Sequence, residues 1–194
     1  MIKLHNRIFR RILKEHLTLR RQLARLKYRL VGQIKLHPGC IIEPKAELKL
    51  SHSSSLEYVI EVGKATTVKD QALLYPRTGF IKVGENCSIN PNCILLGYGG
   101  ITIGNKVRIA ANTSIVAFSH VFSDSTASII DQGNICKGIL IEDDVWIGTG
   151  VRILDGVTVG KGSIIGAGSV VNKSIPAYSV AVGVPAKVIR SRAS

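Results

Sequence analysis

The sequence predicts an all-β fold in which a parallel β-solenoid of about six coils winds around a triangular prism. The main observation is an aliphatic residue at every sixth position of the second half, at Ile141, Ile147, Ile153, Val159, Ile165 and Val171. Neither a helix of about 3.6 residues per turn nor an isolated strand has this period. A hexad instead supplies one short strand and one bend, so three hexads complete a coil and their aliphatic side chains stack into a continuous core.

The same register extends toward the N-terminus, which is the second observation. Its earlier aliphatic positions are Leu36, Ile42, Leu48, Val62, Val68, Leu74, Val83, Ile89, Leu95, Ile103, Ile109 and Ile115. Four positions after many of these residues stands a small or β-branched residue, as at Cys40, Thr66, Cys87, Thr113 and Ser163. These residues are expected to point inward near the corners of the prism.

The solenoid is expected over residues 36–176, with an excursion at 121–140 where the register slips most. Residues 1–35 precede it as a basic amphipathic helical segment, and residues 177–194 follow it as a short C-terminal tail. A chain of 194 residues with 5% aromatic residues fits one narrow domain of this kind.

The positive charge of the chain is concentrated in the N-terminal segment. Residues 1–31 hold ten Lys and Arg against one acid, a net of +9 out of the formal +13. Ile12, Leu19, Leu23, Leu26 and Leu30 are spaced as one stripe of a helix. This stripe is expected to pack on the solenoid or on a neighbouring subunit, or to contact an anionic membrane surface. A nucleic-acid partner is not expected, because aromatic residues are not interleaved with the cations.

The sequence shows no signal peptide and no spanning segment, so we expect a cytoplasmic protein, peripheral at the inner face of the membrane if the helix binds lipid. Three of the four cysteines occupy the small-residue row, and Cys136 lies outside the repeat. No Cys-x-x-Cys pair occurs, and His120 is the only histidine after His52. A zinc site, which a hydratase on the same type of prism would need, is therefore not expected.

His120 is the strongest candidate for chemistry. It closes a coil at the mouth of the excursion, and long loops on rigid repeats tend to carry function. Its neutral imidazole is suited to act as a general base.

Four stretches resemble a known family: Ala117-Phe118-Ser119-His120, Val145-Trp146-Ile147-Gly148, Ile165-Gly166-Ala167-Gly168-Ser169-Val170-Val171 and Gly183-Val184-Pro185-Ala186-Lys187-Val188-Ile189. Over roughly residues 60–190 the chain resembles the hexapeptide-repeat O-acetyltransferases that use acetyl-coenzyme A, including the maltose, galactoside and colanic acid acetyltransferases. The resemblance implies a left-handed β-helix, the known exception to right-handed crossovers. It also implies a homotrimer with active sites between subunits.

The resemblance also assigns roles. His120 matches the catalytic histidine, and Asn90 matches an asparagine that helps to place the acceptor. The residues matched to the acetyl-coenzyme A side are Thr149 and Ala167 at the pantetheine arm, with Lys173, Pro185, Ala186, Lys187 and Arg190 toward the nucleotide and in the tail.

Residues of the excursion and the single tryptophan complete the predicted acceptor side. Gln132 lies where several relatives place a carboxamide or an acid near the histidine, as does Asn134, and Asp124 and Asp131 are candidates to orient the imidazole. Trp146 is expected to point outward, either as a wall of the acceptor or coenzyme pocket or packed beneath the excursion.

The coil register indicates where the halves of the site lie. Asn90 is the eighth residue of its coil and His120 the eighteenth of the next, which separates them by roughly 25 Å of extended chain. We therefore expect them to serve one site only from different subunits, so that activity requires the trimer.

The resulting prediction is transfer of an acetyl group from acetyl-coenzyme A to a saccharide hydroxyl. An Asp that contacts the sugar in the maltose and galactoside enzymes is replaced here by Gly97-Tyr98-Gly99-Gly100. This departure favours a larger or lipid-linked saccharide of surface polysaccharide biosynthesis. The alternatives are N-acetylation of an amino sugar, acetylation of an antibiotic, and a non-catalytic trimeric scaffold.

Overall fold

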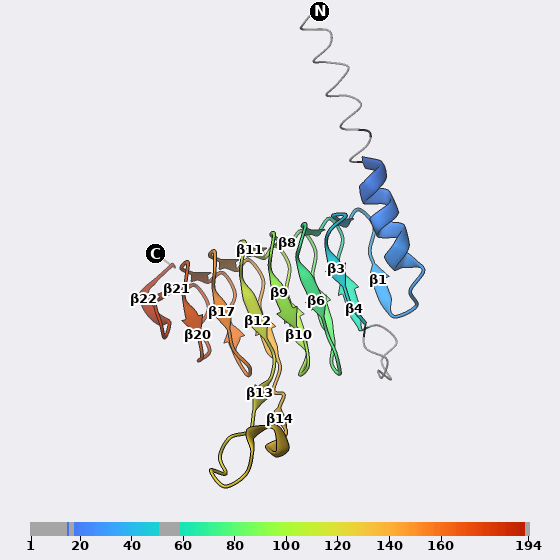
Figure 1. Ribbon diagram of the computed structural model, residues 1–194. Helices are drawn as coiled ribbons and strands as arrows, with labels where there is room; N and C mark the ends of the chain where they lie inside the picture. The colour runs from blue at the N-terminus through green and yellow to red at the C-terminus, as the bar shows by residue number, and fades with distance from the viewer. Residues whose placement is uncertain (1–14, 16–17, 51–58, 193–194) are drawn as a thin grey trace, which may run out of the picture.

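The computed structural model describes residues 15, 18–50 and 59–192. Most of the expected N-terminal segment up to residue 17 lies outside these residues, including Ile12. The described chain forms a long triangular prism with a helix at one end and a protruding hairpin near its middle (Figure 1).

Three parallel sheets form the faces of the prism, and each coil contributes one strand to each sheet. Sheet A contains β1 (Ile34–Leu36), β4 (Ile60–Val62), β7 (Ile81–Val83), β10 (Ile101–Ile103), β15 (Ile139–Ile141) and β18 (Thr158–Val159). Sheet B contains β2 (Ile41–Ile42), β5 (Thr67–Val68), β8 (Ser88–Ile89), β11 (Arg108–Ile109), β16 (Trp146–Ile147), β19 (Ile164–Ile165), β21 (Ser179–Val182) and β22 (Lys187–Ser191). Sheet C contains β3 (Glu47–Leu48), β6 (Leu73–Tyr75), β9 (Ile94–Leu96), β12 (Ser114–Val116), β17 (Arg152–Ile153) and β20 (Val170–Val171).

The chain runs from A to B to C in every coil, which defines an A–B, a B–C and a C–A edge of the prism. We number the coils 1 to 6 from β1 to β20. Because paired residues lie in register, each coil repeats the last at a spacing of about 4.8 Å along the prism.

The predicted core is confirmed. Ile89, Ile109 and Ile147 are paired in register through sheet B and are at most 1% exposed. The inward small residues are buried too, and the polar ones have partners: Thr66 donates to Gly84 O at 2.7 Å, and Thr113 to Gly148 O at 3.1 Å. Buried hydroxyl groups are thus satisfied at the corners, where the backbone turns.

The C-terminal tail expected from residue 177 begins as a strand of sheet B. β21 pairs parallel with β19, and β22 returns antiparallel to β21. Val180 and Ala181 are buried, so β21 covers the end of the core.

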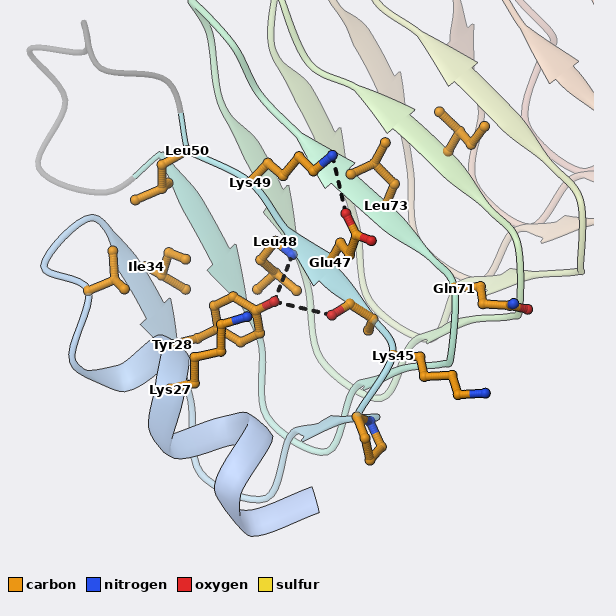
Figure 2. A pocket seen from close by; sticks show the side chains of 14 residues that line it. Lys27, Tyr28, Ile34, Lys45, Glu47, Leu48, Lys49, Leu50, Gln71 and Leu73 are labelled. Carbon is orange, nitrogen blue, oxygen red and sulfur yellow. Dashed lines mark hydrogen bonds and ion pairs between the residues drawn. The ribbon is translucent and has the colours of Figure 1, made fainter. Parts of the chain in front are cut away.

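The helix over residues 18–29 packs against coil 1 through one face. The Tyr28 hydroxyl donates to Ala46 O at 3.1 Å and accepts from Leu48 N at 3.3 Å (Figure 2). Arg21 pairs with Glu43 at 3.0 Å, and Arg25 donates to His37 O at 3.1 Å. Packing on the solenoid, one of the expected alternatives, is therefore seen for this face. No helix within the described ranges is both long and apolar enough to cross a membrane.

Candidate active site

His120 lies at the base of the hairpin that leaves the C–A edge after coil 4. β13 (Ser119–His120) pairs antiparallel with β14 (Asn134–Ile135), which places His120 opposite Asn134 (Figure 1). The excursion between them contains a short 3-10 helix, Ile129–Gln132. His120 is exposed, so its imidazole is accessible to a substrate.

The return of the excursion is fixed by one carboxylate. Asp155 accepts hydrogen bonds from Lys137 N at 2.9 Å and from Gly138 N at 2.9 Å. Since Asp155 belongs to the turn of the next coil, it ties the end of the excursion to the C–A edge. The return end of the hairpin that carries His120 is thereby held to the solenoid.

A ladder of side chains runs along the C–A edge to His120. The rings of Tyr98 and Phe118 are stacked with centroids 4.2 Å apart. The rings of Phe118 and His120 meet edge to face, with centroids 5.8 Å apart and an angle of 84° between their planes. Arg77 donates to the Tyr98 hydroxyl at 3.0 Å. This bond raises the pKa of the exposed Arg77 guanidinium. All four residues follow strands of sheet C, which is why successive coils bring them together.

The sequence did not predict this ladder as a functional feature. In the sequence Phe118 is part of a family motif and Tyr98 belongs to the stretch that replaces an acid. The available signal was spacing: Tyr98 and Phe118 are 20 residues apart and occupy equivalent places after β9 and β12.

The Gln132 side chain binds backbone groups within the excursion. Its carboxamide accepts from Asp124 N at 3.0 Å and donates to Asp124 O at 2.9 Å and Ala127 O at 3.1 Å. The Asp124 carboxylate accepts from the backbone and hydroxyl of Thr126, bonds that lower its pKa. These bonds engage Asp124 within its own loop rather than at His120, and the predicted contact of Gln132 with an acceptor stays a prediction.

Asn90 and most of the residues predicted to bind the coenzyme lie along the B–C edge. Asn90, Thr149 and Ala167 follow the sheet B strands of coils 3, 5 and 6, and the Asn90 amide donates to Ile109 O at 2.7 Å. The turn between β21 and β22 closes on the same edge, where Ala186 N donates to Val170 O at 2.8 Å and Gly183 N to Ser169 Oγ at 3.0 Å. Pro185 and Lys187 flank Ala186, so this group lies next to Ala167.

The glycines at this edge have structural reasons. A Cβ on Gly166 would lie 2.6 Å from Val182 Cγ1, so β21 packs closely there. Gly168 has φ of +71° with open space around it, a turn conformation that favours glycine. Thr149 and Ala167 are both exposed beside them, which leaves a smooth edge with small side chains.

Three predicted residues lie elsewhere. Lys173 follows β20 and therefore shares the C–A edge with His120. Arg190 lies on β22 opposite Val180. Trp146 is on β16 in sheet B, 55% exposed, between Arg108 and Ile164. Sheet B is the face opposite the C–A edge, so Trp146 does not lie beneath the excursion of its own chain, and its predicted place in a pocket wall stays a prediction.

One chain does not bring His120 together with Asn90, Thr149 and Ala167, because sheet C separates their edges. Among residues 15, 18–50 and 59–192 no group of three or more His, Cys, Asp and Glu side chains could hold a metal ion.

Comparisons with known proteins agree with this fold. The family model for the bacterial transferase hexapeptide of six repeats matches residues 138–173, and that for the hexapeptide repeat of succinyl-transferase matches residues 80–117. The N-acyltransferase AntD from Bacillus cereus, solved with dTDP and 3-hydroxybutyryl-CoA, superposes with a TM-score of 0.73 at 23% identity over 87% of this chain and 88% of AntD. The class of protein is therefore a left-handed β-helix built from hexapeptide repeats.

Similarity over longer stretches gives the family. A putative acetyltransferase of Saccharomyces cerevisiae is 36% identical over 171 residues, 85% of this chain and 82% of that protein. The galactoside O-acetyltransferase of Escherichia coli is 36% identical over 151 residues, 74% of this chain and 73% of the enzyme. The chain belongs to the hexapeptide-repeat acetyltransferase family. It spans only about half of two other relatives, 44% of a probable acetyltransferase of Mycobacterium tuberculosis and 52% of a putative one of Schizosaccharomyces pombe.

Proposed function

We propose that this protein transfers an acetyl group from acetyl-coenzyme A to a hydroxyl of a saccharide, with His120 as the general base. The observation that carries the proposal is the exposed imidazole of His120, held on a clamped hairpin beside a ladder of aromatic rings. Family membership supports the reaction class, and the galactoside O-acetyltransferase among its relatives supports a sugar hydroxyl as acceptor.

The complete site is proposed to lie between subunits of a homotrimer. If three prisms stand around a threefold axis with sheet C turned inward, the C–A edge of each meets the B–C edge of the next. The outward residues of sheet C favour this face, because Leu73, Leu96 and Val116 are half-buried and Ile94 and Leu154 are each 40% exposed. Sheet A is a poorer interface, since three of its strands present a charged residue outward, at Lys35, Glu61 and Lys82, whereas two strands of sheet C do so, at Glu47 and Arg152.

The levels of the coils support the same arrangement. His120 leaves coil 4, whereas Asn90 is on coil 3, Thr149 on coil 5 and Ala167 on coil 6. With about 4.8 Å per coil, an acceptor near the partner's Asn90 and a thioester near the partner's Thr149 would approach His120 from opposite sides.

The residues of the B–C edge fit a coenzyme A arm. Small exposed side chains at Thr149 and Ala167 leave room for a thin pantetheine chain, and Lys187 with Arg190 supplies cations for phosphates. Lys173 would reach the same nucleotide from the neighbouring C–A edge.

In the proposed reaction His120 takes the proton of the acceptor hydroxyl as its oxygen attacks the acetyl carbonyl. Backbone N–H groups at the edge stabilise the developing oxyanion. The imidazolium then returns the proton to the departing thiolate, so the C–S bond breaks, the ester bond forms and His120 regains its neutral state.

The acceptor is proposed to be a larger or lipid-linked saccharide of surface polysaccharide biosynthesis. The stacked rings of Tyr98 and Phe118 beside His120 suit the apolar face of a sugar. An amino sugar acetylated on nitrogen is the second candidate, and the fold shared with the N-acyltransferase AntD favours it. The same base serves both acceptors.

The test is release of coenzyme A thiol from acetyl-coenzyme A with a panel of saccharides and amino sugars. His120→Ala should lower turnover by about 10²- to 10⁴-fold while the fold persists. His37→Ala is the matched control, because His37 is bound to Glu61 on the A–B edge and should leave turnover unchanged. Equal turnover of His120→Ala and the wild type would refute the general-base role.

A further inference from the structure

The N-terminal helix uses only one of its faces to bind the solenoid. Its contacts come from Arg21, Arg25 and Tyr28, which are spaced by four and three residues and so share one side of a helix. Tyr28 is 6% exposed and anchors this side to β3 (Figure 2).

The opposite face carries a leucine stripe made of Leu19, Leu23, Leu26 and Leu30. These side chains are 54%, 56%, 52% and 80% exposed. At about 100° per residue, the stripe is turned by roughly half a revolution from the docking face. The solenoid of the same chain therefore does not cover it.

Cations border the leucine stripe on both sides. Arg20 lies along one border and Arg29 along the other, and both are exposed. Lys27 is also exposed on the Arg20 side, with its ammonium 5.0 Å from the centroid of the Tyr28 ring. Glu15 is the one acid among the helical residues that the structure describes. An apolar stripe between two rows of cations is the pattern of a helix that lies in the plane of an anionic bilayer surface, with the cations reaching the headgroups.

The same charges disfavour a second copy of this helix as the occupant. Leucines spaced four, three and four apart would also suit a coiled-coil seam, in which Arg20, Lys27 and Arg29 would take the flanking positions. Between identical antiparallel helices these positions would place Arg20 near Lys27 of the second copy, and such cations repel.

We propose that the leucine stripe is a membrane-docking surface for bilayers that carry anionic lipids. The helix lies at the coil 1 end of the prism, away from the hairpin that carries His120 (Figure 1). Docking there leaves the C–A edge of coil 4 free, so the enzyme can work on an acceptor held at the bilayer.

The test is co-sedimentation of the full chain at low salt with vesicles of phosphatidylcholine and phosphatidylglycerol, and with vesicles of phosphatidylcholine alone. Two triple variants separate the contributions: Leu19→Ser, Leu23→Ser and Leu26→Ser remove the stripe, and Arg20→Gln, Lys27→Gln and Arg29→Gln remove its borders. Lys64→Gln, Lys106→Gln and Lys161→Gln on the A–B edge make the matched control, with the same loss of charge.

The wild type and the control should bind the anionic vesicles and release them in high salt, and both helix variants should bind about tenfold or more weakly. Acetyl-coenzyme A turnover with a soluble acceptor should stay unchanged in both helix variants, which shows that they fold and keeps this test separate from that of the reaction. Wild-type protein left in the supernatant, or a stripe variant that binds as well as the wild type, would overturn the proposal. The proposal would also be overturned if, in the absence of vesicles, the wild type formed an oligomer that the stripe variant did not form. The stripe would then be a subunit contact.

Discussion

The Phe118 and His120 rings meet edge to face, with centroids 5.8 Å apart and planes at 84°. Phe118 is itself stacked on Tyr98, whose hydroxyl is bound by Arg77. We therefore expect a ladder that begins two coils earlier to orient the proposed base. Phe118 is a positioning residue in this arrangement.

Replacing Phe118 by Leu should lower kcat by about three- to tenfold, because an edge-to-face contact is worth about 0.5–1.5 kcal/mol. Phe118→Tyr should retain most of the activity. Phe80→Leu is the control, since it removes the same ring from the turn before β7, where Phe80 packs beside Gly100 rather than in the ladder. The measurement is kcat and KM as functions of pH. An unchanged kcat in Phe118→Leu would show that Phe118 does not position His120.

Asp155→Asn should loosen the excursion. The variant loses a charged acceptor for Lys137 N and Gly138 N, a loss of about 1–3 kcal/mol at that point. Hydrogen exchange should rise over residues 119–138 and stay unchanged over coils 1 and 2. Glu85→Gln, a surface carboxylate of coil 3, is the control. Equal protection of the excursion in Asp155→Asn and the wild type would show that the clamp is dispensable.

The thiols should react in a fixed order. Burial raises the pKa of Cys40, Cys87 and Cys93, whereas Cys136 is exposed and its pKa is raised by partial desolvation and by Asp155. One thiol per chain should react quickly with an aromatic disulfide reagent, faster as the pH rises, and Cys136→Ser should abolish this phase. Two fast thiols in the native protein would contradict the burial of the inner row.

Glu61 should make stability depend on pH at the acidic end. The bond from His37 at 2.7 Å, helped by Lys35 at 3.2 Å, lowers the pKa of Glu61. A carboxylate with a lowered pKa stabilises the folded state above its unfolded pKa, near 4.3, and loses that contribution as the pH falls through the folded value. Glu61→Gln should therefore destabilise the protein at pH 7 and have little effect near pH 3.

Denaturant unfolding at a fixed protein concentration measures this difference. Glu47→Gln, which breaks an exposed pair with Lys49, is the control and should have a small effect at either pH. A difference for Glu61→Gln that grows toward low pH would contradict the assigned sign.

The period of six predicted the core because the aliphatic residue that recurs at every sixth position faces inward in a narrow prism, as Ile109 and Ile147 do. The same register placed Asn90 and His120 on different edges, which the strand order confirms. The Tyr98 and Phe118 stack escaped prediction because register slips between coils hide which corner residues meet. The docking face of the helix was also hidden, since Arg21 and Arg25 look like solvated cations until Glu43 and His37 lie opposite them.

We propose that each active site joins the C–A edge of one subunit to the B–C edge of the next. His120→Ala and Ala167→Trp should each be inactive alone, the first without the base and the second with the coenzyme edge blocked. Mixed trimers assembled from equal amounts of both variants should recover about a quarter of the wild-type turnover, because one site in four then pairs two intact edges. No recovery in mixed trimers would contradict the claim, since sites within single chains would each keep one defect.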